Sequence, residues 1–352
     1  MHKMKNYSKK IRTAALLFIL VSFINFSYSL KAQICGIYTD VDQFSWGMVS
    51  WSLKGNVKQR DRTTWELLPN VTNLEKGKLV SKNSIYFNEK GKQTLDTLIK
   101  TGASSIRTTY IYDSSGNVTD MSSYHLDGKL VYRLTYKYNK VNRVTEEYHF
   151  IANNKLDYTI IYTYDIKGNL IEKKSIDPKK KYDYRYTYKY DSQNNQTEEW
   201  CNYYSNDSLL GRKTFKKYDL KNNLTEEVCY SVVGKIYYRN TYKYNVDSNK
   251  TEYVGYFHGD SLIIKETYKY NAAHKLTAQS NYDGKDNLLS TCTRTYDNKN
   301  TLTEAISYKK DGSLDSKYEL KYTYDTTGNC TSMTTYLDGK PQAITEWVIK
   351  YW

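Results

Sequence analysis

Hydrophobic and polar residues alternate along most of this chain, in segments of about ten residues that are separated by short polar turns. Alternation with a period of two is typical of a β-strand that packs one face and exposes the other. Turns of two kinds follow one another along the sequence, and each pair of segments therefore forms an antiparallel hairpin. The pattern predicts an all-β protein built from tandem β-hairpin repeats.

One of the two turns marks a fixed repeat. A tyrosine followed by Asp or Asn recurs at nine regularly spaced positions, and the steps between them are 26 residues in six cases and 28 in the other two. A period in this range indicates an array of small units that are each stabilised by their neighbours. The nine marker residues, each taken as position zero of its repeat, are Asp113, Asn139, Asp165, Asp191, Asp219, Asn245, Asn271, Asp297 and Asp325.

The marker and the residue three positions later have the chemistry of a hairpin turn. An Asp or Asn side chain can bond to its own backbone two residues further on, and position +3 is a residue that tolerates a left-handed backbone. Together they predict a type I turn closed by a bulge. Position +3 is Gly116, Gly168 or Gly328 in three repeats and Asn, Ser or His in the others. The same phase extends backwards to Gly77, and we assign residues 48–352 to one repeat array.

Parity along the strands predicts which side chains share a face. Odd positions carry mostly Tyr, Leu and Val, and even positions −6 and −2 carry Lys or Arg in most repeats. We therefore expect one packed face and one wet face. The Lys and Arg columns have two interpretations: a solvated face that resists edge aggregation, or a ligand stripe.

Position +7 is a glutamate in six repeats, and parity places it on the packed face. The hairpin is expected to bring it opposite position −3, so that Tyr136 faces Glu146 and Lys216 faces Glu226. A carboxylate that repeats in every unit serves each unit alike, and we interpret the column as structural hydrogen bonding and not as catalysis. Its members are Glu146, Glu172, Glu198, Glu226, Glu252 and Glu304.

The N-terminus has the pattern of a secretion signal. Five basic residues precede a largely apolar run from Ala14 to Phe26, and a plausible cleavage site follows Ala32. We assign residues 1–32 to a signal peptide and 33–47 to a short leader, with no transmembrane segment after cleavage. The expected location is secreted, periplasmic or at the cell surface of a bacterium.

The net charge of the chain bears on whether it binds nucleic acid. The formal charge is +14, but residues 1–32 hold six Lys or Arg and no Asp or Glu, which leaves 14 − 6 = +8. This charge is spread evenly, whereas a nucleic-acid binder concentrates it in a patch, and we expect no nucleic-acid partner.

Cys201 and Cys229 hold equivalent positions in adjacent repeats, too far apart for a disulfide. Cys292 and Cys330 are interpreted as small buried hydrophobic residues.

Signatures of an enzyme are weak. Gly259-Asp260-Ser261-Leu262 matches the start of a GDSL-hydrolase motif, but it falls at a second-turn position and no Asp-x-x-His follows it. The histidines lack metal-ligand spacing, and no phosphate-binding glycine loop is present in the sequence. We expect no catalytic residues, no cofactor and no metal.

The Tyr-Asp-x-x-Gly-Asn core at Tyr112, Tyr164 and Tyr324 resembles the YD repeats of RHS proteins, and the resemblance covers roughly residues 48–352. It implies a strip of antiparallel hairpins that curls into a shell, which in large members encloses a C-terminal toxin domain. This chain has about ten repeats and ends 27 residues after Asp325. That length leaves no room for a toxin domain and argues against closure into a full cage.

Two function classes remain from the sequence. One is an exported, non-catalytic repeat protein that binds glycan or protein through its curved face. The other, implied by the resemblance, is an accessory or shell component of an RHS-type interbacterial toxin system. The ligand, its binding residues and the oligomeric state are left open.

Overall fold

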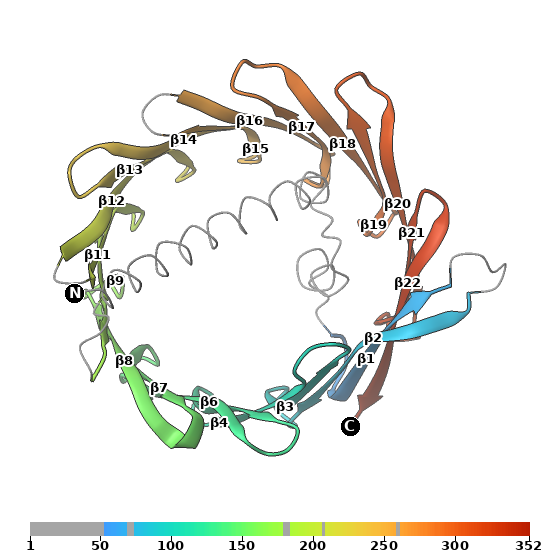
Figure 1. The fold of residues 1–352 in the computed structure, drawn as a ribbon, viewed down its shortest axis with the longest axis horizontal. Coiled ribbons are helices and arrows are strands. Elements are labelled where there is room, and N and C mark those ends of the chain that lie inside the picture. The colour runs from blue at the N-terminus through green and yellow to red at the C-terminus, as the bar shows by residue number, and fades with distance from the viewer. Residues whose placement is uncertain (1–52, 69–73, 179–183, 206–207, 258–260) are drawn as a thin grey trace, which may run out of the picture.

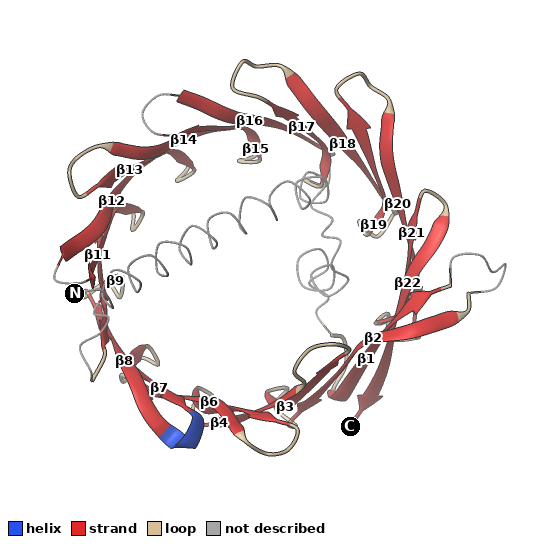
Figure 2. Cartoon of the chain, viewed as in Figure 1, coloured by secondary structure: helices blue, strands red, loops and turns tan. Residues whose placement is uncertain are grey.

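The computed structural model describes residues 53–68, 74–178, 184–205, 208–257 and 261–352, and these form one all-β sheet with a single short 3₁₀ turn (Figures 1 and 2). The signal and leader assignments, 1–32 and 33–47, lie outside the described residues. The elements in order are β1 (Val57–Leu67), β2 (Lys76–Phe87), β3 (Gln93–Lys100), β4 (Ile106–Tyr112), β5 (Val118–His125), β6 (Leu130–Tyr138), β7 (Val144–Ile151), η1 (Ala152–Asn154), β8 (Lys155–Tyr164), β9 (Leu170–Ile176), β10 (Tyr184–Tyr190), β11 (Gln196–Ser205), β12 (Ser208–Tyr218), β13 (Leu224–Ser231), β14 (Ile236–Tyr244), β15 (Lys250–Phe257), β16 (Ser261–Tyr270), β17 (Leu276–Tyr282), β18 (Leu288–Tyr296), β19 (Leu302–Lys309), β20 (Leu314–Tyr324), β21 (Cys330–Leu337) and β22 (Lys340–Tyr351).

The sheet closes on itself, which corrects the expectation of an open, curled strip. Consecutive strands pair antiparallel throughout, and β22 returns to pair with β1 in a register that includes Arg60 opposite Ile349 and Thr64 opposite Thr345. The hydroxyls of Thr64 and Thr345 lie 3.1 Å apart at this seam and are buried. Figure 1 shows the resulting ring of 22 strands. Closure removes both free sheet edges, which would otherwise be open to pairing with another chain.

The Tyr-Asp turns have a common geometry. In the turn at Asp113, the Gly116 amide donates to the Asp113 carbonyl at 3.0 Å, and the Asp113 amide donates to the Asn117 carbonyl at 2.9 Å. The Asp113 carboxylate accepts the Asn117 amide at 2.8 Å. Gly116 has a φ of +84°, which glycine adopts without the steric cost of a side chain. In Figure 1 the second turns, such as those between β17 and β18 and between β19 and β20, lie at the outer rim of the ring.

Each hairpin contains a bulge that the sequence pattern did not reveal, and it changes the faces. Lys137 pairs with Glu146, but the next residue, Tyr138, pairs with Val144. The extra residue moves every later side chain to the other face, because side chains alternate with a period of two. A second bulge beside the other turn, where Tyr124 pairs with Leu130, has the same effect. The assignment of positions +7 and +11 to the packed face by simple parity is therefore wrong. Position +5 precedes the extra residue and stays on the packed face as predicted, where Leu302 joins the buried core.

The observed faces follow from the strand register. We call the face that carries positions −5 and −3 before the turn and +8 and +10 after it the tyrosine face. The face that carries −6, −4 and −2 before the turn and +7 and +9 after it is the charged face. The most deeply buried side chains lie on the tyrosine face, including Cys292, Ala305, Leu320 and Met333, which pack as one cluster. Side chains converge on the concave side of a closed sheet, and we infer that the tyrosine face lines the inside of the ring.

The tyrosines of the repeat join neighbouring hairpins. The ladder between β5 and β6 ends where Asp120 pairs with Thr135, and the carbonyl of Val118 lies beyond it. The Tyr138 hydroxyl donates to that carbonyl at 2.6 Å, and so supplies a partner to a backbone group that would otherwise lack one. Nine such bonds, of 2.6–3.0 Å, are made by Tyr112, Tyr138, Tyr164, Tyr190, Tyr218, Tyr244, Tyr270, Tyr296 and Tyr322.

Candidate binding surface

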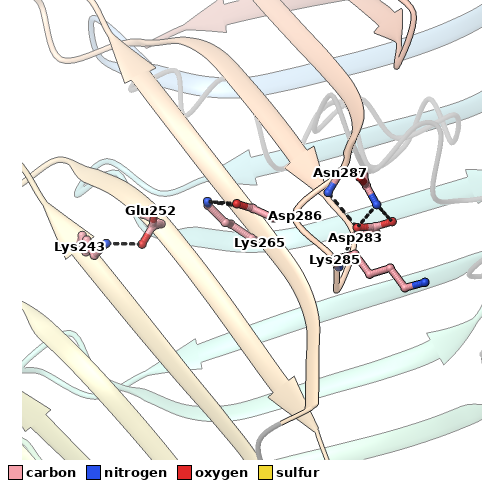
Figure 3. A network of polar contacts seen from close by, with 7 residues as sticks. All are labelled: Lys243, Glu252, Lys265, Asp283, Lys285, Asp286 and Asn287. Atoms are coloured by element: carbon pink, nitrogen blue, oxygen red, sulfur yellow. Dashed lines mark hydrogen bonds and ion pairs between the residues drawn. The ribbon is translucent and has the colours of Figure 1, made fainter.

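The charged face carries a belt of ion pairs around the ring. In each of several hairpins the lysine at −2 faces the glutamate at +7 across the strands, as in Lys137–Glu146 at 3.0 Å. The same carboxylate also reaches the basic residue at −6 of the next hairpin: Glu226 contacts Lys217 at 2.5 Å and Arg239 at 2.7 Å. Figure 3 shows the pair Lys243–Glu252, with strands of the opposite wall behind it.

The predicted partners of the glutamate column are therefore wrong by one residue. Lys216 faces Glu227, and Glu226 faces Lys217. Likewise Tyr136 faces Glu147, and Glu146 faces Lys137. The bulge beside the turn is the physical reason, because it inserts one residue between the turn and position +7. Each of the six glutamates has an ion-pair partner on the charged face.

Hydrogen bonds from neighbouring side chains keep the glutamates of the ion-pair belt ionised. Hydrogen bonds from Tyr148 and Lys137 lower the pKa of Glu146. The hydrogen bond from Lys217 lowers the pKa of Glu226, against the opposing effect of desolvation, and Arg239 adds to the lowering. A carboxylate with a lowered pKa holds no proton to donate at neutral pH.

Aromatic residues at +11 extend the belt towards the second turns. The basic residue at −6 lies directly opposite this position, as Arg133 does opposite Phe150. The Arg133 guanidinium carbon is 5.7 Å from the Phe150 ring centre, and the Arg239 carbon is 5.8 Å from the Tyr256 centre. These are cation–π distances, and they hold the basic side chains extended along the sheet surface.

The sequence-predicted turn residues form a second ring of contacts. In five repeats the asparagine at +4 bonds to the +3 side chain of the next turn, for example Asn117 to Asn142 at 3.0 Å and Asn249 to His274 at 2.9 Å. Where +4 is Arg143, the next +3 residue is Gly168, and a Cβ there would collide with the guanidinium. The remaining pairs of the five are Asn169–Asn194, Asn195–Asn222 and Asn223–Ser248.

The nine marker residues all accept the same two hydrogen bonds. Each accepts the +3 amide with its backbone carbonyl at 3.0–3.2 Å and the +4 amide with its side chain at 2.8–3.0 Å. The three predicted glycines Gly116, Gly168 and Gly328 have φ between +82° and +88°. These contacts set the turn, and most turn residues lie beside the turns of neighbouring repeats. Asp325 also accepts a hydrogen bond from the Tyr351 hydroxyl at 2.8 Å. The markers are Asp113, Asn139, Asp165, Asp191, Asp219, Asn245, Asn271, Asp297 and Asp325.

The cysteines divide into two groups. Cys201, Cys229 and Cys330 are free thiols, which confirms the prediction that Cys201 and Cys229 do not pair with each other. Cys292 and Cys330 are both buried among hydrophobic residues, as their interpretation from the sequence predicts. Burial raises the pKa of the Cys330 thiol to about 12, which suppresses the reactive thiolate there.

Three further features concern the residues that the structure describes: metal ligands, membrane-spanning helices and the GDSL-like segment. No group of three or more His, Cys, Asp or Glu that could hold a metal ion is found among those residues. No helix among them is long and apolar enough to cross a membrane. Of the GDSL-like segment, Gly259 and Asp260 lie outside the described residues, and Ser261 begins strand β16.

The described residues thus define an all-β hairpin-repeat protein with a closed sheet. No family model matches the chain, and no curated protein does. Among solved structures, TcdB2-TccC3 is 13% identical over 72% of this chain at a TM-score of 0.35, and this chain spans 16% of that one. A porin-like protein from Bacteroides uniformis is 12% identical over 84% of this chain and 98% of its own length, at a TM-score of 0.28. Another from Bacteroides vulgatus is 9% identical over 85% and 99%, at 0.23. Similarity at these TM-scores supports no argument about this chain.

Proposed function

We propose that this chain is an exported, non-catalytic binding protein, in which an RHS-like array of hairpins forms a rigid ring that presents its charged face to a glycan or protein ligand. Export is supported by the basic start and apolar run in residues 1–32. The RHS-like assignment is supported by the Tyr-Asp turns and by the tyrosine hydroxyls that join successive hairpins.

The belt of paired carboxylates carries the non-catalytic part of the proposal. A general acid needs a pKa raised towards the working pH, whereas Glu146, Glu198 and Glu226 have lowered pKa values. Each of the three contacts a lysine at 3.3 Å or less. Groups that are fixed in this way hold the surface in shape and offer a ligand a preorganised array of donors and acceptors.

The carboxyl group of Asp96 differs from the belt glutamates, because its pKa is raised and not lowered. Burial raises its pKa, and its Oδ1 accepts a hydrogen bond from Asn83 at 2.5 Å. It lies on the tyrosine face, where Arg60 and Arg62 contribute positive charge. We interpret this group as part of the packing beside the seam between β1 and β22, because the arginines offset the charge of a half-buried carboxylate.

Two measurements test the proposal. Fluorescently labelled mature protein should bind the surface of the producing cells or of neighbouring species, as read by flow cytometry. The bound cell-surface material, recovered and analysed by mass spectrometry after prolonged incubation, should be chemically unchanged. Cleavage or modification of that material at a rate that depends on protein concentration would refute the non-catalytic assignment. Absence of surface binding would refute the binding function.

A second candidate is a shell component of an RHS-type toxin system, and closure of the ring favours it. A closed sheet encloses an interior, which an open strip does not. In this case the protein should co-purify with a second polypeptide encoded beside it, and that polypeptide should become resistant to protease only in its presence. Secretion and immunity genes beside this gene would favour this function, and glycan-uptake genes would favour the first.

A further inference from the structure

The repeats can be compared with one another, and one hairpin departs from the pattern on the charged face. Position −4 is threonine in six of the nine repeats, but it is Phe215 in the hairpin of β12 and β13. One strand away, position +9 of the preceding repeat is Trp200, the only tryptophan in that column. Each of the two positions therefore carries a large aromatic side chain where most other repeats have a smaller one.

A groove of about 570 Å³ lies on the charged face beside Phe215. Its lining includes the apolar residues Val228 and Ile236 and the charged residues Lys217, Glu226 and Arg239. This volume falls in the range of small-molecule sites, roughly 300–1,000 Å³. The groove crosses three adjacent strands, β12, β13 and β14, in the middle of the sheet.

Two exposed aromatic rings line up with the groove. Phe215 is 36% exposed and Trp200 is 45% exposed. Lys213 lies between them: its Nζ is 4.5 Å from the Phe215 ring centre and 5.4 Å from the Trp200 ring. Tyr230 meets Phe215 edge to face at 5.8 Å, which fixes the orientation of the phenylalanine ring. The result is a row of apolar platforms separated by charged groups.

We propose that this groove, lined by Phe215 and Arg239 and flanked by Trp200 on the adjacent strand β11, binds an oligosaccharide. This inference rests on the proposed binding function and names the ligand class and its site. A pyranose ring has an apolar face of C–H groups and a rim of hydroxyls. The aromatic faces suit the first, and the lysine, arginine and glutamate side chains can donate to and accept from the second. The ion pairs Lys217–Glu226 and Arg239–Glu226 hold these polar groups in place before the ligand arrives.

The surroundings favour a saccharide over a peptide or a nucleic acid. Strands β12, β13 and β14 are paired on both sides, and no free strand edge is offered for an extended peptide to extend the sheet. A polyphosphate backbone would meet Glu226 inside the groove and Glu198 beside it. The two carboxylates largely offset the charge of Lys213, Lys217 and Arg239.

The repeat supplies substitutions that the fold already accepts. Phe215→Thr places the residue that six other repeats carry at −4, and Trp200→Val places the residue that the next two repeats carry at +9. Ile161→Thr is the matched control, because Ile161 is a large apolar residue at −4 in another hairpin, on strand β8 and outside the groove. Far-ultraviolet circular dichroism and melting temperature verify that each variant is folded.

The experiment has two arms. In the first, wild type and variants are applied to an array of immobilised neutral and uronic-acid oligosaccharides, and the strongest retained sugar is titrated by calorimetry. We expect Phe215→Thr and Trp200→Val each to weaken binding at least about tenfold, a change of about 1.4 kcal/mol, and Ile161→Thr to leave it unchanged. Equal affinity of all four proteins would overturn the assignment of the groove, while the binding function would stand.

The second arm separates the ligand classes on whole cells. Periodate, which cleaves vicinal diols of sugars, should abolish surface binding of the wild-type protein, and protease treatment of the cells should leave it intact. Binding that resists periodate but is lost after protease treatment would replace the saccharide with a protein ligand. Loss of surface binding altogether would refute the proposed function as well, and the two failures are thus distinguishable.

Discussion

The two faces of the ring use similar residues for different purposes. On the tyrosine face, half-buried tyrosines surround a buried centre that includes Leu320 and Cys292. On the charged face, Tyr256 lies under Arg239, and Glu226 is paired with two cations. The inner face is ordered by desolvation and the outer face by charge pairing. The comparison teaches that sequence composition alone does not distinguish them, because only the bulges decide which residue goes to which face.

The largest effect that distinguishes the two faces is expected in the stability of the fold at alkaline pH. Burial, followed by the negative charge of Glu147, raises the pKa of Tyr136 from 10 to about 12, and burial with Glu199 does the same for Tyr188. The unfolded tyrosine ionises first, and stability is therefore intact below pH 10 and lost as the pH rises towards 12. Circular dichroism and tyrosinate absorbance followed together should show cooperative unfolding in that window.

The variant Tyr242→Phe sharpens this test, because burial and Glu227 raise the pKa of Tyr242 to about 12 as well. Removal of this ionising hydroxyl should move the alkaline midpoint to higher pH. Tyrosines that all titrate near pH 10 while the sheet stays folded would contradict the assignment of these residues to a desolvated inner face.

The next effect compares two leucines. Leu320 is 4% exposed on the tyrosine face, and Leu289 is 46% exposed. Leu320→Ala should lower the free energy of unfolding by roughly 2–5 kcal/mol, because it removes buried methyl groups and leaves a cavity. Leu289→Ala should change it by less than about 0.5 kcal/mol. Urea unfolding of both variants measures the difference, and equal midpoints would show that the two faces do not differ in packing.

A smaller effect concerns single hydroxyls. Tyr244→Phe leaves the Leu224 carbonyl without the donor that now lies 2.9 Å away, and should cost roughly 1–3 kcal/mol. Tyr256→Phe is its control on the charged face, since the ring that contacts Arg239 is retained. A loss of stability in the control as large as that in Tyr244→Phe would show that the hydroxyl bond between hairpins is not the cause.

The smallest effect is expected from the ion-pair belt. Glu226 is well covered, but its partner Lys217 is 74% exposed, and solvent screens the pair. Glu226→Gln should cost about 1 kcal/mol at neutral pH and less in high salt. Because the folded pKa of Glu226 lies below its ordinary value of 4.5, its contribution is present above that pH and is lost as the pH falls through the lowered value. An effect independent of both pH and salt would contradict an ionic role.

The repeat and its turns could be predicted from the sequence, because each turn is a local matter of a few residues such as Asp113 and Gly116. The faces could be predicted only as far as the first bulge. Parity placed Glu226 opposite Lys216, whereas the bulge places it opposite Lys217. Closure depends on the pairing of Arg60 with Ile349, which lie at the two ends of the array and share no local signal.

The candidate site was missed for a related reason. The features that the repeats share define the fold, whereas the site is marked by residues that differ, such as Phe215 at a position that is threonine in six of the nine repeats. That signal is present in the sequence alone. The groove beside it is not, because Phe215, Glu226 and Arg239 come together only once the strand register is known.

The turn contacts also record the order in which the hairpins follow one another. Tandem repeats are prone to recombination, which can delete or exchange units without a change of reading frame. In this ring an asparagine at +4 bonds to a polar side chain at the next +3, as Asn117 does to Asn142, whereas the Arg143 guanidinium occupies the space beside Gly168. A hairpin with Asn at +3 placed after Arg143 would require that guanidinium to move aside. The contacts between turns therefore favour some orders of the hairpins along the array and disfavour others.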